Sequence, residues 1–167
     1  GSVPHIPAIP GLDRVPFLTT DTLFERRTRP HHLVILGGGP VGCEMAQAHR
    51  RLGCRVTLIE QGTLLPRDDP ELVAPVRHAL AAEAVVLHEQ AAILRVEPRA
   101  DDGFALVLQQ GGAECRIEGS DLLVATGRRP CIDGLGLETA GVAHGPHGIS
   151  VDPRLRTTNP RIFAIGD

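Results

Sequence analysis

Residues 33–42 read LVILGGGPVG, and this stretch decides the fold. The four apolar residues at 33–36 are followed at once by glycine, which is typical of a strand buried on both faces of a parallel sheet. Gly37, Gly39 and Gly42 then give the spacing GxGxxG, and a helical pattern follows until Gly53. The order of strand, glycine turn and helix predicts the start of a parallel α/β sheet.

The segments that follow continue this alternation of strands and helices. We predict a strand at 55–60 (RVTLIE), a helix that begins at Asp69-Pro70, and a third strand at 84–87. Apolar residues at helical spacing predict which faces of the helices pack on the sheet. They are Val41, Met45, Ala48 and Leu52 in the first helix, and Leu72, Val73, Val76 and Leu80 in the second.

The period of the pattern changes after residue 90. Three short strand patterns follow, at 91–96, 104–109 and 113–117. They are joined by Asp102-Gly103 and Gly111-Gly112, which are hairpin signals, so we predict an antiparallel meander. An apolar strand at 122–126 returns to the parallel sheet, and a last strand is expected at 162–165. The predicted fold class is α/β: a Rossmann-type parallel sheet with helices on both faces and an antiparallel β-meander crossover.

Composition and periodicity divide the chain into three predicted segments. Residues 1–32 are rich in proline and lack periodicity, which indicates a connector with one helical turn at 22–27. Residues 33–130 form the predicted dinucleotide-binding core, with the meander at about 91–118. Residues 131–167 are rich in loop signals and form a return segment.

Composition excludes several classes of function. The chain has 167 residues and a formal net charge of −3, so there is no basic surplus for nucleic acid. All 17 basic residues are arginine, which excludes Schiff-base lysine chemistry and the lysine of a P-loop. No apolar run approaches the roughly 18 residues that a membrane span needs. The four cysteines and the pairs His31-His32 and His144/His147 lack metal-site spacing, so we expect no metal and a reduced, cytoplasmic chain.

The glycine turn has the spacing of a dinucleotide-binding site. Gly37 permits the tight turn, Gly39 lets a pyrophosphate approach the backbone, and Gly42 lets helix and strand pack closely. The turn as a whole supplies six predicted contacts: Gly37, Gly38, Gly39, Pro40, Val41 and Gly42. The start of the following helix offers free N–H groups to the phosphates.

An acidic residue closes the second predicted strand. Glu60 lies 60 − 42 = 18 residues after the last glycine, near the expected spacing of about 20 for the residue that binds the adenosine ribose. Its carboxylate would accept hydrogen bonds from the ribose hydroxyls and repel a 2′-phosphate, which favours NAD over NADP. Arg67 follows a few residues later and would either contact a 2′-phosphate or pair with Asp68 and Asp69.

Four stretches together carry a resemblance to a known family. They are GSVPHIPAIPGL at 1–12, GGGPVGCEMAQAHRRLG at 37–53, LLVATGRRP at 122–130 and TTNPRIFAIGD at 157–167. In this order they resemble the FAD-dependent pyridine nucleotide–disulfide oxidoreductases, with the strongest likeness to the dihydrolipoamide dehydrogenase and mercuric reductase branch. In that family an NAD domain is inserted within an FAD domain, so the resemblance implies an NAD domain of a longer parent. The parent would be a homodimer with FAD and dimerisation domains outside this chain.

The resemblance also implies roles for individual residues. Glu44 matches a glutamate that faces the flavin and pairs with a lysine of the missing domain. Ala91 matches a position beside the adenine, and Gly127 matches a glycine that lines the nicotinamide end. Asp167 matches the aspartate that binds the ribityl or phosphate groups of FAD. The redox cysteines and the acid–base histidine of the family have no counterpart here, so no catalytic residue is expected in this chain.

The resulting functional prediction is NAD(H) binding for hydride transfer to or from FAD. Two other classes compete with it: a module that senses NAD without catalysis, and a methyltransferase that uses S-adenosylmethionine. The first leaves the AIGD end unexplained, while the GxGxxG spacing and the meander disfavour the second. A relative that prefers NADP is a third alternative.

Overall fold

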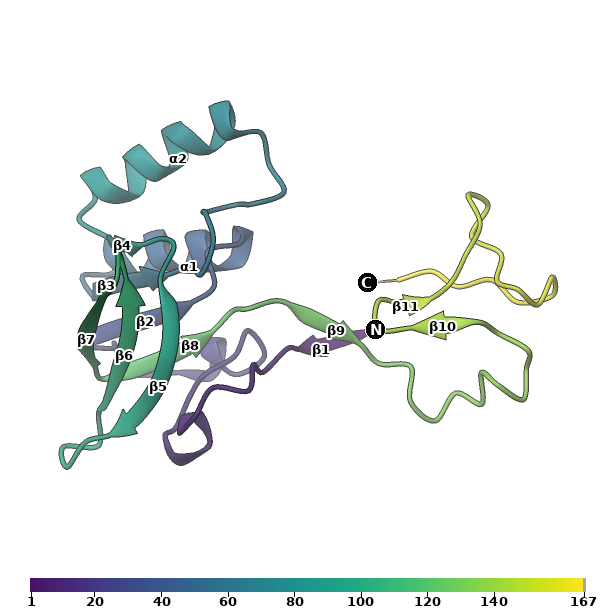
Figure 1. Cartoon of the computed structure of the whole chain (residues 1–167), viewed down its shortest axis with the longest axis horizontal. Helices are drawn as coiled ribbons and strands as arrows, with labels where there is room; N and C mark the ends of the chain where they lie inside the picture. Colours follow the sequence, from purple (N-terminus) through teal and green to yellow (C-terminus); the bar gives the residue numbers. More distant parts are fainter. Residues whose placement is uncertain (167) are drawn as a thin grey trace. The chain divides into compact units, whose positions relative to one another are not determined.

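The predicted strand at 33–36 is the centre of a parallel sheet. In the computed structural model it is strand β2 (His32–Leu36) of a four-stranded sheet with the order β4-β3-β2-β8 (Figure 1). The other strands are β3 (Arg55–Ile59), β4 (Val86–His88) and β8 (Asp121–Val124), and all of the pairings are parallel. The α/β class is therefore confirmed.

The structure describes residues 1–166, which fall into two compact units. The larger unit is formed by residues 6–127 and contains the parallel sheet. The smaller unit combines residues 1–5 with the chain from Arg128 onward. The division into connector, core and return segment stays a prediction.

Both α-helices of the described chain pack on one face of the parallel sheet. They are α1 (Pro40–Arg51) and α2 (Pro70–Ala82), which lie near each other in Figure 1. Ala46 of α1 and Leu80 of α2 share one hydrophobic cluster with Leu33 and Ile35 of β2. The prediction of helices on both faces is correct for one face only. On the other face, residues 1–166 contribute no helix apart from the 3-10 turn η1 (Leu12–Arg14).

The buried face of α1 differs from the predicted one. Gly42, Cys43 and Ala46 are buried, whereas Leu52 is 66% exposed and Val41 is 40% exposed. The prediction of the stripe that includes Val41 and Leu52 was therefore wrong. Small residues let the helix axis approach the sheet closely, and the larger apolar side chains are displaced to its sides.

The second helix follows its predicted pattern more closely. Val73 and Leu80 are buried and Val76 is partly buried, as expected, but Leu72 is 70% exposed and does not belong to the packed face. Asp69 caps this helix, since its carboxylate accepts a hydrogen bond of 2.9 Å from the backbone N–H of Glu71.

The predicted meander covers the opposite face of the parallel sheet. It consists of β5 (Ala92–Pro98), β6 (Phe104–Gln110) and β7 (Ala113–Gly119), paired antiparallel in that order. Leu106 and Leu108 of β6 share a hydrophobic cluster with Val34 and Leu36. Side chains alternate along β2, so that Leu33 and Ile35 face the helices while Val34 and Leu36 face the meander.

The proline-rich segment before β2 belongs to the larger unit from residue 6 onward and contributes to its core. Leu12 and Val15 are buried in the cluster on the meander side. Leu23, in the 3-10 turn η2 (Leu23–Glu25), is buried on the helix side, which confirms the predicted helical turn at 22–27. Leu18 bridges Leu123 of β8 in parallel, so the segment also extends the edge of the sheet.

The described part of the smaller unit contains two short antiparallel strand pairs and is otherwise turns and loops. Strand β1 (Ser2–Pro4) pairs with β9 (Arg128–Pro130), and β10 (His144–Gly145) pairs with β11 (Gly148–Ile149). The strand predicted at 162–165 is absent from the described residues, where Phe163 forms only an isolated bridge with Arg156. Phe163 is 60% exposed, so the apolar pattern did not mark a buried strand here.

The described part of the chain contains no helix with the length and apolar character needed to cross a bilayer.

Candidate functional site

The glycine turn lies at the carboxyl edge of the parallel sheet. It connects β2 to α1, and the order of strands reverses at β2, with β3 and β4 on one side and β8 on the other. In open α/β sheets, ligands bind outside the carboxyl ends of the strands at such a reversal. The fold therefore directs attention to the residues that follow β2, β3, β4 and β8.

Two glycines of the GxGxxG motif are required by close packing. A Cβ atom built on Gly42 would lie 1.9 Å from the carbonyl oxygen of Gly37, and one built on Gly37 would lie 2.4 Å from that of Ala125. Gly37 also has a φ of +109°, which disfavours a side chain, and its N–H donates a 2.8 Å hydrogen bond to the carbonyl of Ile59. The turn is thus locked against the ends of β3 and β8.

Gly39, the remaining glycine of the motif, instead faces open space. A Cβ atom on Gly39 would have no heavy atom within 4 Å, although Gly39 is the residue that caps α1. Pro40 begins the helix and Val41 follows it, partly exposed. The first N–H groups of a helix have no partner within it and attract anions. A pyrophosphate therefore fits this position in both space and charge.

Glu60 is bound directly to the glycine turn. Its Oε2 accepts a 2.7 Å hydrogen bond from the N–H of Gly38, and its Oε1 accepts one of 2.8 Å from the N–H of Gly62. A side chain on Gly38 would collide with this arrangement, because its Cβ would lie 2.6 Å from Leu64 and 2.9 Å from the Cβ of Glu60. The carboxylate is thus held beside the turn, and each oxygen retains a further lone pair for a ligand hydroxyl.

A second carboxylate at this edge was missed by the sequence analysis. Glu89 follows β4 and accepts two hydrogen bonds from Arg77 of α2, at 2.6 and 2.8 Å, and one of 2.7 Å from the N–H of Leu64. The hydrogen bonds from Arg77 are the main reason why the pKa of Glu89 is lowered. The ion pair ties α2 to the loop after Glu60. An acid two residues after the end of the third predicted strand was the signal that could have identified it.

Further contacts join the meander to the same edge. The side-chain N–H of Gln110 donates to the carbonyl of Glu89 at 2.7 Å, and its oxygen lies 2.9 Å from Nδ1 of His88. Ala91 is buried and donates its N–H to the carbonyl of Glu60 at 3.1 Å. The structure therefore brings Ala91 next to Glu60 through the backbone.

The remaining predicted residues are placed less closely. Glu44 is exposed on α1 and lies beyond its first turn, so an interaction with the positive end of the helix does not explain it. Gly127 follows β8, is exposed and has a φ of +116°. Asp167 lies outside the described residues.

Two other chemistries find no support near the turn. Burial, followed by the charge of Glu89, raises the pKa of the Cys43 thiol to about 11, so Cys43 behaves as a buried core residue rather than a nucleophile. Among residues 1–166, no group of three histidine, cysteine or acidic side chains is placed to hold a metal ion.

The whole sequence, residues 1–167, matches the family described as "Pyridine nucleotide-disulphide oxidoreductase". The chain belongs to this family, as the fold and the glycine turn indicate.

Individual relatives agree with this assignment. The chain is 44% identical to the mercuric reductase of Streptomyces lividans over 168 residues, which are all of this chain and 35% of that protein. It is 42% identical to the dihydrolipoyl dehydrogenase of Thermus scotoductus over 142 residues, 83% of this chain and 31% of the relative. Among solved structures, the HOCl-induced flavoprotein disulfide reductase RclA from Escherichia coli in its Cu(II) complex superposes over the whole chain with a TM-score of 0.86 and 32% identity, and 38% of that protein is covered.

The chain thus spans about a third of the length of these relatives. About two thirds of each relative therefore has no counterpart in the 167 residues.

Proposed function

We propose that this chain binds NAD(H) and presents the nicotinamide for hydride transfer to or from FAD, which would be held by another part of the parent protein. The observation that carries the proposal is the carboxylate of Glu60, fixed 2.7 Å from the N–H of Gly38 at the end of β3. A carboxylate at that position accepts hydrogen bonds from ribose hydroxyls and repels a 2′-phosphate, so the proposal specifies NAD rather than NADP.

The residues of the turn divide the binding task among them. The open space at Gly39 and the N-terminus of α1 would take the pyrophosphate, while Gly37 and Gly42 keep the turn close to β3 and β8. Ala91, next to Glu60, would lie on the adenine side, and Gly127, after β8, on the nicotinamide side. When bound, the reduced nicotinamide would donate a hydride, which carries two electrons and one proton, and the oxidised nicotinamide would accept one. The chain itself contributes orientation and electrostatics.

The wider proposal concerns the parent. Its FAD domain would provide the flavin, which Glu44 would face and Asp167 would help to bind. We infer that the parent is a homodimeric, cytoplasmic oxidoreductase whose electrons pass on to a disulfide-type or metal substrate. Family membership and the partial coverage of the relatives support this wider proposal.

Calorimetric titration of the chain with NADH and NADPH tests the proposal. We expect NADH to bind more tightly, and Glu60→Gln to weaken NADH binding about tenfold or more, the loss expected from hydrogen bonds to a charged acceptor. Glu114→Gln, which removes an exposed carboxylate of β7, is the matched control and should bind NADH like the unsubstituted chain.

Two results would overturn the proposal. Equal or tighter binding of NADPH would reject the preference for NAD and direct attention to Arg67. Failure of both nucleotides to bind to folded protein, checked by far-ultraviolet circular dichroism, would reject binding by this chain.

A further inference from the structure

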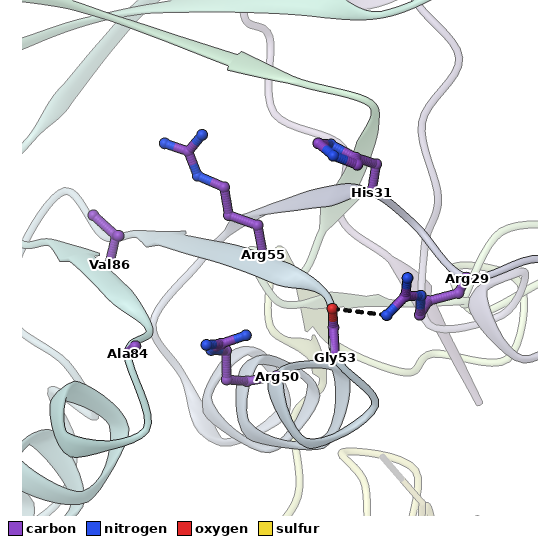
Figure 2. Close-up of a pocket in the computed structure, with 7 residues that line it drawn as sticks. All are labelled: Arg29, His31, Arg50, Gly53, Arg55, Ala84 and Val86. Atoms are coloured by element: carbon purple, nitrogen blue, oxygen red, sulfur yellow. Dashed lines mark hydrogen bonds between the residues drawn. The ribbon is translucent and has the colours of Figure 1, made fainter.

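We propose that a basic pocket at the amino edge of the parallel sheet binds a small phosphate-bearing anion. Four basic side chains line this cavity of about 470 Å³: Arg29, His31, Arg50 and Arg55. They come from the segment before β2, from the end of α1 and from the first residue of β3 (Figure 2). The other lining residues, Gly53, Ala84 and Val86, carry no charge.

The pocket is separate from the glycine turn. Arg55 begins β3, whereas Glu60 follows the end of that strand. Five residues of strand span about 16 Å at roughly 3.3 Å per residue. An anion in the basic pocket therefore occupies the opposite edge of the sheet from the proposed dinucleotide.

The arginines of the pocket differ in their partners from arginines elsewhere in the chain. Arg77, for example, is paired with the carboxylate of Glu89. Among the ion pairs of residues 1–166, none joins Arg29, Arg50 or Arg55 to a carboxylate. Three positive groups thus line one cavity without a carboxylate among its lining residues, and this excess of positive charge favours an anion in the cavity.

Two of these side chains are held in place by the backbone. Arg29 donates through Nη1 to the carbonyl of Gly53 at 2.9 Å, the bond drawn in Figure 2. Arg50 donates to the carbonyls of Glu83 and Cys54, at 2.8 and 3.0 Å. These bonds use one and two of the five N–H donors of each guanidinium, so donors remain for a ligand.

The chemistry of the cluster selects the class of ligand. Guanidinium groups match phosphate oxygens in geometry, often with two parallel hydrogen bonds, and they stay charged at every physiological pH. Arg55 is exposed at the start of β3 and does not cap α1, so helix capping does not explain why an arginine occupies this position. A phosphate-bearing anion in this cavity would supply the negative charge that is missing among the residues that line it with Arg29, Arg50 and Arg55.

The test is a titration of the isotope-labelled chain with inorganic pyrophosphate, followed by amide chemical shifts. We expect saturable shifts at Gly53, Ala84 and Val86, independent of any shifts at Gly39. Arg55→Gln should weaken binding at these amides about tenfold, the loss expected for one charge-assisted hydrogen bond. The control Arg14→Gln removes the same charge from an exposed arginine of η1 that does not line the pocket, and it should leave the affinity unchanged.

Three results would overturn the proposal. The pocket amides could fail to shift, pyrophosphate could shift only the amides of the glycine turn, or both variants could weaken binding equally. The last result would show a general effect of net charge. The amide spectrum of each variant without ligand verifies that it is folded, so that a loss of binding is not a loss of structure.

Discussion

Alanine at two glycines of the same turn should have opposite consequences. Gly42→Ala places a methyl group 1.9 Å from the carbonyl oxygen of Gly37, whereas Gly39→Ala places one in open space. We expect the first variant to lose stability and the second to keep its stability but lose affinity for NADH. The pair therefore separates the packing role of the turn from its binding role.

The magnitudes follow from the two local geometries. At Gly42 the carbonyl must move about 1.5 Å to reach an ordinary contact distance, and overpacking of this kind costs about 3 kcal/mol. Helix propensity returns at most about 1 kcal/mol, which leaves a loss of about 2 kcal/mol. At Gly39, φ is −73° and accommodates alanine. A weaker helix cap costs about 0.7 kcal/mol, and a less flexible unfolded chain returns about as much.

Urea denaturation followed by far-ultraviolet circular dichroism measures the free energy of unfolding, because the chain has no tryptophan or tyrosine for fluorescence. Calorimetry then measures NADH binding, which should weaken about tenfold in Gly39→Ala through the loss of one hydrogen bond to the pyrophosphate. A Gly42→Ala variant as stable as the unsubstituted chain would contradict the packing role of Gly42. A Gly39→Ala variant destabilised as much as Gly42→Ala would contradict the open space at Gly39.

Three further predictions concern the packing of α2, the titration of His32 and the reactivity of two cysteines. Leu80→Ala should cost about 2–4 kcal/mol in urea denaturation, while Leu72→Ala on the exposed side of the same helix should cost less than about 0.5 kcal/mol; equal losses would contradict the burial pattern of α2. Burial, followed by the charge of nearby Arg55, lowers the pKa of His32, so the unfolded chain gains a proton first and stability should fall as the pH drops below about 6.5, by at most about 1.4 kcal/mol per pH unit. His32→Gln should flatten this dependence between pH 6.5 and 5, and an unchanged slope would exclude His32 as its source. Iodoacetamide at pH 8 should modify exposed Cys131 and spare buried Cys43 until the chain unfolds, as mass spectrometry of digested samples would show; rapid native labelling of Cys43 would contradict its raised pKa.

The glycine turn could be predicted from sequence because its causes are local. Gly37, Gly39 and Gly42 lie within six residues, and strand and helix patterns on either side fix their context. The position of Glu60 beside this turn could be predicted for a similar reason, since Glu60 ends a recognisable strand. The hairpins of the meander also depend on neighbouring residues, and their three strands were found.

Features that depend on tertiary distance were not predicted. The ion pair of Arg77 with Glu89 requires the position of α2 over the sheet, which no local pattern contains. The prediction of the packed face of α1 was wrong because hydrophobicity ranks Leu52 above Gly42, whereas a close approach of the helix to the sheet requires the smaller residue. Similarly, the pairing of β1 with β9 joins segments more than 120 residues apart.

The strand order has a consequence for the growing chain. One side of β2 pairs with β3, which follows soon after it, but the other side pairs with β8, where Leu33 meets Asp121 after 121 − 33 = 88 residues. At a synthesis rate of about 5–20 residues per second, that apolar edge waits roughly 4–18 seconds for its partner. Closure of so long a loop also makes the β2–β8 pairing a late event in folding. Until β8 has been made, β2 has a free edge that is open to aggregation, although β2 lies inside the finished sheet.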